Sequence, residues 1–247
     1  MKSFKITSLL LAALFLISCS NDDDIIIDPA ENCKIITMTS GSGNSSTVYN
    51  ISYNNDGKIS QLSHPDGKLT WLYNSQGMIH SRFDSNNHLY YKADIELNAN
   101  GHPISIAAEN YDNNGDVTST TVHSFEYNNQ GELIKWIQKT GNNPETTQIL
   151  SWSGGNLTQV SSETHTSEYE YYTDQVVQQG DFYQLYFTAV FGTSMINNKN
   201  LVKSTESSNG DTQNVNYEYD QEGRITKLTI SYSSGDELEL SYQYQCN

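Results

Sequence analysis

The sequence predicts an all-β domain, an antiparallel meander of hairpin repeats that curls into a soluble barrel or near-barrel. Three observations predict it: a short turn motif recurs along the chain, apolar and polar residues alternate between its copies, and the chain has three cysteines, two of which lie near opposite ends of the alternating region. Alternation with period two is typical of strands with one buried and one solvated face.

The recurring turn reads Tyr, Asn or Asp, two variable residues, Gly, one variable residue and an aliphatic residue. Clear copies span residues 53–59, 73–79, 111–117, 127–133 and 219–225, with looser copies at 97–101 and 152–157. The Asn or Asp can accept a hydrogen bond from the backbone two residues on. The glycine tolerates positive φ. We therefore predict hairpins with positive φ at Gly57, Gly77, Gly115, Gly131 and Gly223, and Asn87 in the glycine role of a further copy.

One segment departs from alternation. Apolar residues between Phe182 and Val190 recur at positions i, i+3, i+4, i+7 and i+8, with Asp181 as a possible N-cap and Gly192 as a stop. This spacing predicts one short helix near 181–191. Alternation also fits the segment, so a further strand is the alternative.

The first 31 residues read as targeting and tether. Residues 1–18 combine a basic start with an apolar run too short to span a membrane, as in a lipoprotein signal peptide. Cys19 follows Ser18 at the place where bacterial lipoproteins are cleaved and lipidated, so we expect lipidation of Cys19. Ordinary cleavage with Cys19 as a bystander is the alternative. Residues 19–31 form an acidic tether that cannot pack, and residues 32–247 form a single β domain.

The net charge of the chain limits the classes of partner that it is expected to bind. Loss of residues 1–18 removes Lys2 and Lys5 and moves the formal net charge from −16 to −18. That excess argues against nucleic acid as a partner. The expected membrane partner is outer-membrane lipid, held through the Cys19 anchor.

The remaining cysteines, Cys33 and Cys246, begin the first strand and end the last strand after the tether. In an oxidising or extracellular compartment we expect them to form a disulfide. Since bonded cysteines need Cα atoms within about 7 Å, the bond would bring the two edges of the sheet together and close it. The alternative is two separate thiols in loosely held termini.

Three features carry a family resemblance: the Cys19 motif with the acidic run at 20–24, the hairpin repeats, and the interrupting segment at 185–201. The chain resembles Bacteroidetes lipoproteins grouped as domain of unknown function 4595, and its hairpins resemble tyrosine–aspartate repeats. The resemblance implies a porin-like fold and lipid-anchored display on the outer face of the outer membrane. It supplies no catalytic residues. A literal porin needs an outward apolar band, whereas one face of each expected strand is polar, so we expect a soluble barrel with its apolar face inward.

The sequence contains few residues in patterns that indicate metal, cofactor or ligand binding. The six histidines lack zinc-ligand spacing, and no cofactor or metal motif is present. Residues 112–116 faintly resemble a calcium loop, which the hairpin turn explains equally well. Three tryptophans could form a ligand platform, although packing in the core is their default. Their positions are Trp71, Trp136 and Trp152.

Two functions remain. The first is a non-catalytic surface module that binds a glycan, a peptide or a partner protein. The second is a hydrolase acting on glycans with carboxylates from distant strands. The carboxylates considered are those that alternate along strands: Glu168, Glu170, Glu237 and Glu239. We favour the binding module because no constellation of residues supports catalysis.

Overall fold

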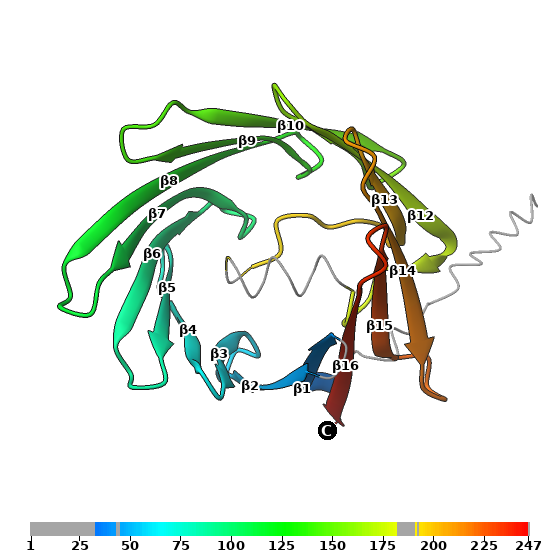
Figure 1. Cartoon of the computed structure of the whole chain (residues 1–247), viewed down its shortest axis with the longest axis horizontal. Coiled ribbons are helices and arrows are strands. Elements are labelled where there is room, and N and C mark those ends of the chain that lie inside the picture. Colours follow the sequence, from blue (N-terminus) through cyan, green and yellow to red (C-terminus); the bar gives the residue numbers. More distant parts are fainter. Residues whose placement is uncertain (1–32, 43–44, 182–190, 192, 247) are drawn as a thin grey trace, which may run out of the picture.

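The computed structural model describes residues 33–42, 45–181, 191 and 193–246. They form an antiparallel sheet that closes into a barrel, in which every strand pairs with its neighbours in sequence and the first strand pairs with the last (Figure 1). The all-β antiparallel fold and its closure, expected from the sequence, are confirmed. The strands are β1 (Cys33–Ser42), β2 (Ser45–Tyr53), β3 (Ile59–His64), β4 (Gly67–Tyr73), β5 (Gly77–Asp84), β6 (Leu89–Leu97), β7 (Pro103–Tyr111), β8 (Val117–Tyr127), β9 (Leu133–Thr140), β10 (Thr146–Ser153), β11 (Asn156–Ser161), β12 (Thr166–Val176), β13 (Asn200–Ser207), β14 (Thr212–Tyr219), β15 (Ile225–Tyr232) and β16 (Glu237–Cys246).

Two expectations fall largely outside the described residues. The helix expected near 181–191 depends on residues 182–190, and the signal peptide, Cys19 and the acidic tether lie within residues 1–32. Every element with bounds in the described part of the chain is a strand. In that part, no helix has the length and apolar character needed to cross a membrane.

The strands place apolar side chains inside the barrel and polar ones outside. On β8, His123 and Phe125 are buried, whereas their neighbours Val122, Ser124 and Glu126 are exposed. Alternation along a strand sends successive side chains to opposite faces, so the buried set forms one continuous core. The barrel therefore has the sidedness that the sequence predicts.

Six of the hairpin turns share one hydrogen-bond pattern. In the turn after β8, the backbone N–H groups of Gln130 and Glu132 both donate to Asn128 Oδ1, at 3.0 and 2.9 Å. The same two bonds, from residues i+2 and i+4, recur at five other turns. Their acceptors are Asn54, Asp84, Asn98, Asp112 and Asp220. The bond from residue i+2 is the one the sequence predicts, and the bond from i+4 is an addition.

The turn glycines follow the prediction with one exception. Positive φ is confirmed at Gly57, Gly115, Gly131 and Gly223, which have φ between 77° and 85°, and Asn87 takes the glycine role with φ 65°.

The prediction of positive φ is wrong for Gly77. Tyr73 pairs with Met78, which leaves a turn of one residue fewer than the turn after β2, where Tyr53 pairs with Ile59. Gly77 is therefore already the first residue of β5. It is small for a different reason: a Cβ there would lie 1.9 Å from the carbonyl oxygen of Ile95.

The aromatic residue before the turn has a second role. The hydroxyl groups of Tyr53, Tyr73 and Tyr244, each near the end of an even-numbered strand, donate to backbone carbonyls near the start of the preceding odd-numbered strand. The acceptors are Ile35, Ile59 and Ile225, at 2.7, 2.9 and 2.8 Å. Burial raises the pKa of Tyr53 and of Tyr73 to about 12. Each of these bonds joins two adjacent strands, and together they stabilise one end of the barrel.

That end of the barrel also holds the two bonded cysteines, and we call it the disulfide end. It contains every connection from an even-numbered strand to the next odd-numbered one. The opposite end, which we call the far end, contains the connections from odd to even strands, such as residues 112–116 between β7 and β8. The long connection from β12 to β13 leaves from the disulfide end, and its described residues 193–199 run through the interior of the barrel (Figure 1).

Candidate functional site

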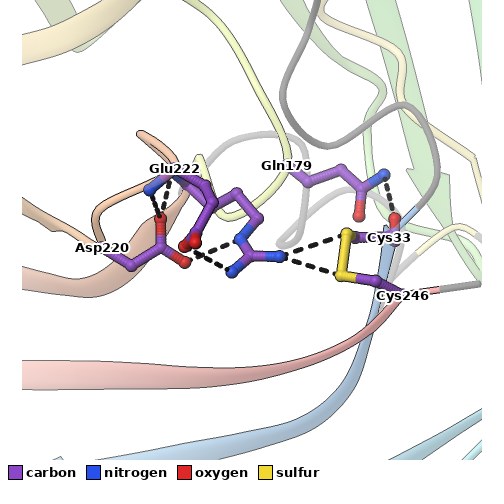
Figure 2. Close-up of a disulfide and its surroundings, with 6 residues drawn as sticks. Cys33, Gln179, Asp220, Glu222 and Cys246 are labelled. Atoms are coloured by element: carbon purple, nitrogen blue, oxygen red, sulfur yellow. Dashed lines mark hydrogen bonds and ion pairs between the residues drawn. A yellow bond between two sulfur atoms is a disulfide. The ribbon is translucent and has the colours of Figure 1, made fainter.

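The structure places Cys33 and Cys246 in a disulfide, with a Cα–Cα distance of 4.0 Å (Figure 2). The two residues are also register partners at one end of the β1–β16 ladder. The bond therefore occupies the place that a tight turn takes between other neighbouring strands at the disulfide end. The carbonyl oxygen of Cys33 accepts a hydrogen bond from Gln179 Nε2 at 3.2 Å, which ties the β12–β13 connection to the same point.

Arg224, in the turn before β15, is placed against the disulfide. Its Nη1 lies 2.8 Å from Cys246 Sγ and 3.2 Å from Cys33 Sγ. Its other nitrogens pair with Asp220 Oδ2 at 2.6 Å and Glu222 Oε2 at 3.0 Å. These carboxylates raise the pKa of the guanidinium, with the hydrogen bond to Asp220 as the main cause. Sequence reasoning missed this arginine because the turn motif leaves its position variable.

The interior next to the disulfide end is closely packed, and its side chains are shielded from solvent. We call it the dry half. Leu133, Leu201 and Ile225 are 0 % exposed. The β12–β13 connection adds Met195 and Ile196 to the same core. The Asn198 side chain holds this connection in place, since its Oδ1 accepts hydrogen bonds from the backbone N–H of Leu157 and the hydroxyl of Tyr171, at 2.9 and 3.1 Å.

The interior next to the far end has a different lining. Apolar side chains such as Leu69, Val160 and Leu238 point inward there. Beside them lies a set of polar or aromatic side chains that are only half-buried although they point into the barrel. We call this set the far-end lining: Arg82, Tyr91, Asn110, Ser119, Thr121, Gln138, Gln148, Ser167, Gln213 and Tyr232. A side chain on the inner face of a closed barrel keeps partial exposure only where solvent reaches the interior. Solvent therefore reaches these side chains at the far end.

A compact cluster forms the floor of this lining on β4–β6. His80 is 0 % exposed, stacks on Trp71 with ring centroids 4.9 Å apart, and accepts a hydrogen bond at Nε2 from Arg82 Nε at 3.0 Å. The Arg82 guanidinium lies over the Tyr91 ring, 4.5 Å from its centroid. Burial, and next the charge of Arg82, lower the pKa of His80 to about 3, so its imidazole is neutral at ordinary pH.

A second cluster repeats this arrangement on β8 and β9. Trp136 Nε1 donates to His123 Nδ1 at 2.9 Å, and Phe191 packs edge-on against the Trp136 ring. Burial lowers the pKa of His123 as well. In both clusters a neutral imidazole is the acceptor that satisfies an inward-facing donor.

The three tryptophans proposed as a platform do not form a row on the outer surface. Trp71 is 4 % exposed, Trp136 packs in the second cluster, and Trp152 donates from Nε1 to the carbonyl oxygen of Leu133 at 2.8 Å. All three point inward, the packing alternative that the sequence leaves open. Trp71 and Trp136 lie beneath the far-end lining, whereas Trp152 belongs to the bracing bonds of the disulfide end.

The strand carboxylates considered for catalysis lie on the outer face. Glu168 and Glu170 line a surface hollow of about 430 Å³ together with Glu206, and Lys203 Nζ pairs with Glu170 Oε2 at 3.2 Å. Glu237 and Glu239 line a separate hollow of about 380 Å³ across β1, β2 and β16. At the far end of β5, Asp84 follows the inward-facing Arg82 on the same side of the strand, and its carboxylate accepts hydrogen bonds from Asn86 and His88 within the turn.

The calcium-like segment 112–116 is one of the hairpin turns described above. Both Asp112 side-chain oxygens accept hydrogen bonds within the turn, and those from the backbone of Asp116 and Asn114 lower the pKa of the Asp112 carboxyl. Within the described ranges, no group of three or more histidine, cysteine or acidic side chains is placed to hold a metal ion.

The far-end lining can hydrogen-bond a polar ligand and stack against it. It supplies hydroxyl and amide groups, aromatic rings and one cationic group, and the hydroxyl of Ser167 lies 3.2 Å from His165 Nε2. Pairs within it are already ordered: Asn110 Nδ2 donates to Ser119 Oγ at 2.9 Å, and the hydroxyls of Thr121 and Thr140 lie 3.1 Å apart. This arrangement fits binding better than catalysis.

The barrel is similar to that of a porin-like protein from Bacteroides uniformis, with a TM-score of 0.62 and 15% sequence identity over 85% of this chain and 98% of that one. A porin-like protein from Bacteroides vulgatus covers the same shares at 11% identity, with a TM-score of 0.44. No family model and no curated protein matches the chain. The first likeness shows the barrel fold alone, which is the fold that the family resemblance implies.

Proposed function

We propose that this protein is a surface-anchored lipoprotein whose barrel is a non-catalytic binding module, with its ligand site in the far-end lining. The observation that carries the proposal is the lining itself, because polar and aromatic side chains point inward there and remain half-buried. A purely structural barrel gains more stability by filling such positions with apolar residues, as it does at the disulfide end.

The anchor is proposed from the sequence. Cys19 is lipidated, and the acidic run at 20–24 marks the chain for display on the outer face of the outer membrane, as in the lipoproteins of domain of unknown function 4595 that the chain resembles. The polar outer faces of the strands support a lipid anchor over insertion, because a membrane barrel needs an outward apolar band.

The proposed anchor determines which end of the barrel faces the medium. The chain enters the barrel at Cys33, which lies at the disulfide end. A tether that holds Cys19 in the membrane therefore attaches at that end. The far end, on the opposite side of the barrel, is the one that a ligand in the medium meets first.

The ligand is a glycan, a peptide or a segment of a partner protein. Hydroxyl and amide side chains beside aromatic rings suit the hydroxyl-rich faces of sugars and the backbone of an extended peptide equally well. Long polyanions are excluded, since the formal net charge of −16 repels them.

A binding screen with a matched pair of variants tests the proposal. Thr121 and Thr120 are neighbours on β8, but Thr121 points inward at the far end and Thr120 is exposed on the outer face. Ligands of the protein are first sought on glycan arrays and peptide libraries. We expect Thr121→Trp to abolish binding of the hits by filling the interior, and Thr120→Trp to leave it unchanged.

Equal loss of binding in both variants, or hits that bind Thr121→Trp as tightly as the unmodified protein, would remove the far end as the ligand site. Cleavage of a hit during the assay would contradict the non-catalytic reading. Mass spectrometry of the amino-terminal peptide tests the anchor separately, because an unmodified Cys19 would exclude lipidation.

A further inference from the structure

The two bonded cysteines differ in their exposure to solvent. Cys33 is 6 % exposed and sits at the start of β1 beneath Gln179, whereas Cys246 is exposed at the end of β16. A thiolate from solution can therefore approach Cys246 more readily than Cys33. In thiol–disulfide exchange the sulfur that is attacked forms the new bond, and the other sulfur leaves as a thiolate.

Arg224 is placed to stabilise that leaving thiolate. Its Nη1 donates toward both sulfurs, at 2.8 Å from Cys246 Sγ and 3.2 Å from Cys33 Sγ, whereas its Nε and Nη2 face the carboxylates of Asp220 and Glu222. A guanidinium beside a cysteine favours the thiolate over the thiol. A thiol that ionises more readily is the better leaving group, so Arg224 speeds the step in which Cys33 departs.

The two carboxylates that pair with Arg224 weaken this effect without cancelling it. They bind the guanidinium through Nε and Nη2, which leaves Nη1 directed at the sulfurs. The guanidinium also lies over the Tyr244 ring, 5.4 Å from its centroid, which helps to hold Nη1 against the sulfurs.

From this geometry we infer that Cys246 is a modification site for small thiols, at which exchange with a thiol such as glutathione forms a mixed disulfide. The thiolate of the small molecule attacks Cys246 Sγ, a new S–S bond forms there, the Cys33–Cys246 bond breaks, and its electron pair leaves on Cys33 Sγ beside Arg224. No net oxidation occurs. A second small thiol, acting as the reductant, completes reduction by attacking the mixed disulfide, which releases Cys246 as a thiolate and yields an oxidised dimer of the small thiol.

The exchange removes the only covalent link described between β1 and β16. The hydrogen-bonded ladder between these strands extends from Cys33–Cys246 to Gly41–Glu239 and remains in place. The barrel therefore stays closed by backbone pairing while the disulfide end carries a thiol adduct. The inference is independent of the ligand proposed for the far end.

Peptide mapping of the full chain treated with glutathione under native conditions tests the inference. We expect the glutathione adduct on Cys246 and a free thiol on Cys33, with unchanged circular dichroism. Cleavage after Glu31 with a protease specific for glutamate separates Cys19 from Cys33, so the two cysteines are assigned on different peptides. An adduct on Cys33, adducts divided equally between the two cysteines, or no adduct while the barrel stays folded would each overturn the inference.

The rate of exchange tests the role of Arg224. We expect Arg224→Gln to slow adduct formation about three- to tenfold, and Arg224→Lys to recover part of the rate because the charge is kept. Lys227→Gln is the matched control, since Lys227 pairs with Glu239 and Glu218 and no contact joins it to the sulfurs in the described structure. Equal rates in Arg224→Gln and the unmodified protein would overturn this role. If Arg224→Gln does not fold, the comparison of Arg224→Lys with Lys227→Gln decides.

Discussion

The two halves of the barrel interior are built by the same strands and joined by similar turns, yet they differ in what fills them. At the disulfide end, Leu133 and Ile225 are wholly buried and the β12–β13 connection packs against them. At the far end, Gln138 and Gln213 occupy inward positions and are half-buried. Glycine turns with positive φ occur at both ends, as at Gly131 and Gly115. The turn motif therefore sets the strand pairing, and the identity of the inward residues decides which half is a core and which half can bind.

The largest expected effect concerns the bond that closes the dry half. Replacing both Cys33 and Cys246 by serine should lower the free energy of unfolding by about 5 kcal/mol at most, because the loop that the bond closes spans a sequence separation of 213 residues. Denaturant unfolding measures it. Hydrogen exchange should rise first at the Cys33 end of the β1–β16 ladder. Faster exchange at the Gly41 end instead would contradict the assignment of the bond to the disulfide end alone.

A second pair of variants compares the two halves along one strand. Leu133 and Gln138 both belong to β9, the first in the dry half and the second in the far-end lining. Leu133→Ala should cost about 2–5 kcal/mol, since it leaves a cavity in a packed core. Gln138→Ala should change stability by only about 0.5 kcal/mol, because solvent can fill the space. Similar costs in the two variants would mean that the halves are equally packed.

Two glycines sharpen the same comparison at the level of the turns. Gly77→Ala places a methyl group 1.9 Å from a backbone oxygen of β6 and should cost about 3 kcal/mol. Gly115→Ala meets open space and suffers only from its φ of 85°, so about 1 kcal/mol is expected. Thermal unfolding of both variants measures the difference. An equal cost would show that backbone conformation, and not close approach, governs Gly77.

The smallest expected effect is a loss of stability at alkaline pH, which arises from the tyrosine hydroxyls at the disulfide end. The pKa of Tyr53 and of Tyr73 is raised to about 12 in the folded barrel, against about 10 in the unfolded chain. Because the folded state favours the neutral hydroxyl, their contribution is complete below pH 10 and is lost as the pH rises toward 12.

Tyr73→Phe should cost about 1 kcal/mol at neutral pH, where the bond to Ile59 is lost, and should reduce the fall in stability above pH 10. Urea unfolding at several pH values measures both quantities. A fall of unchanged size in the variant would show that other groups cause the alkaline loss.

The sequence predicts much of this fold because its signals are local. An Asn or Asp followed three residues later by Gly specifies a hairpin wherever it occurs, and Cys33 and Cys246 at the two edges predict closure. Gly77 escapes the prediction because the turn is one residue shorter, which depends on strand register and not on the motif. The inward direction of Trp136, the place of Arg224 against the sulfurs and the half-buried lining depend on pairing between distant strands, which a single sequence does not display.

The most direct test of the difference between the halves is the accessibility of a single introduced thiol. Gln148→Cys on β10 places the thiol in the far-end lining, Leu157→Cys on β11 places it in the dry half, and Ser151→Cys places it on the outer face. Labelling with iodoacetamide under native conditions, followed by peptide mapping, gives the three rates. We predict that Gln148→Cys is labelled within about tenfold of Ser151→Cys, and that Leu157→Cys is labelled only through rare opening of the barrel, about a hundredfold more slowly. A thiol at position 148 that is protected as strongly as the one at position 157 would contradict the account, because the far end would then be closed to solvent and to any ligand.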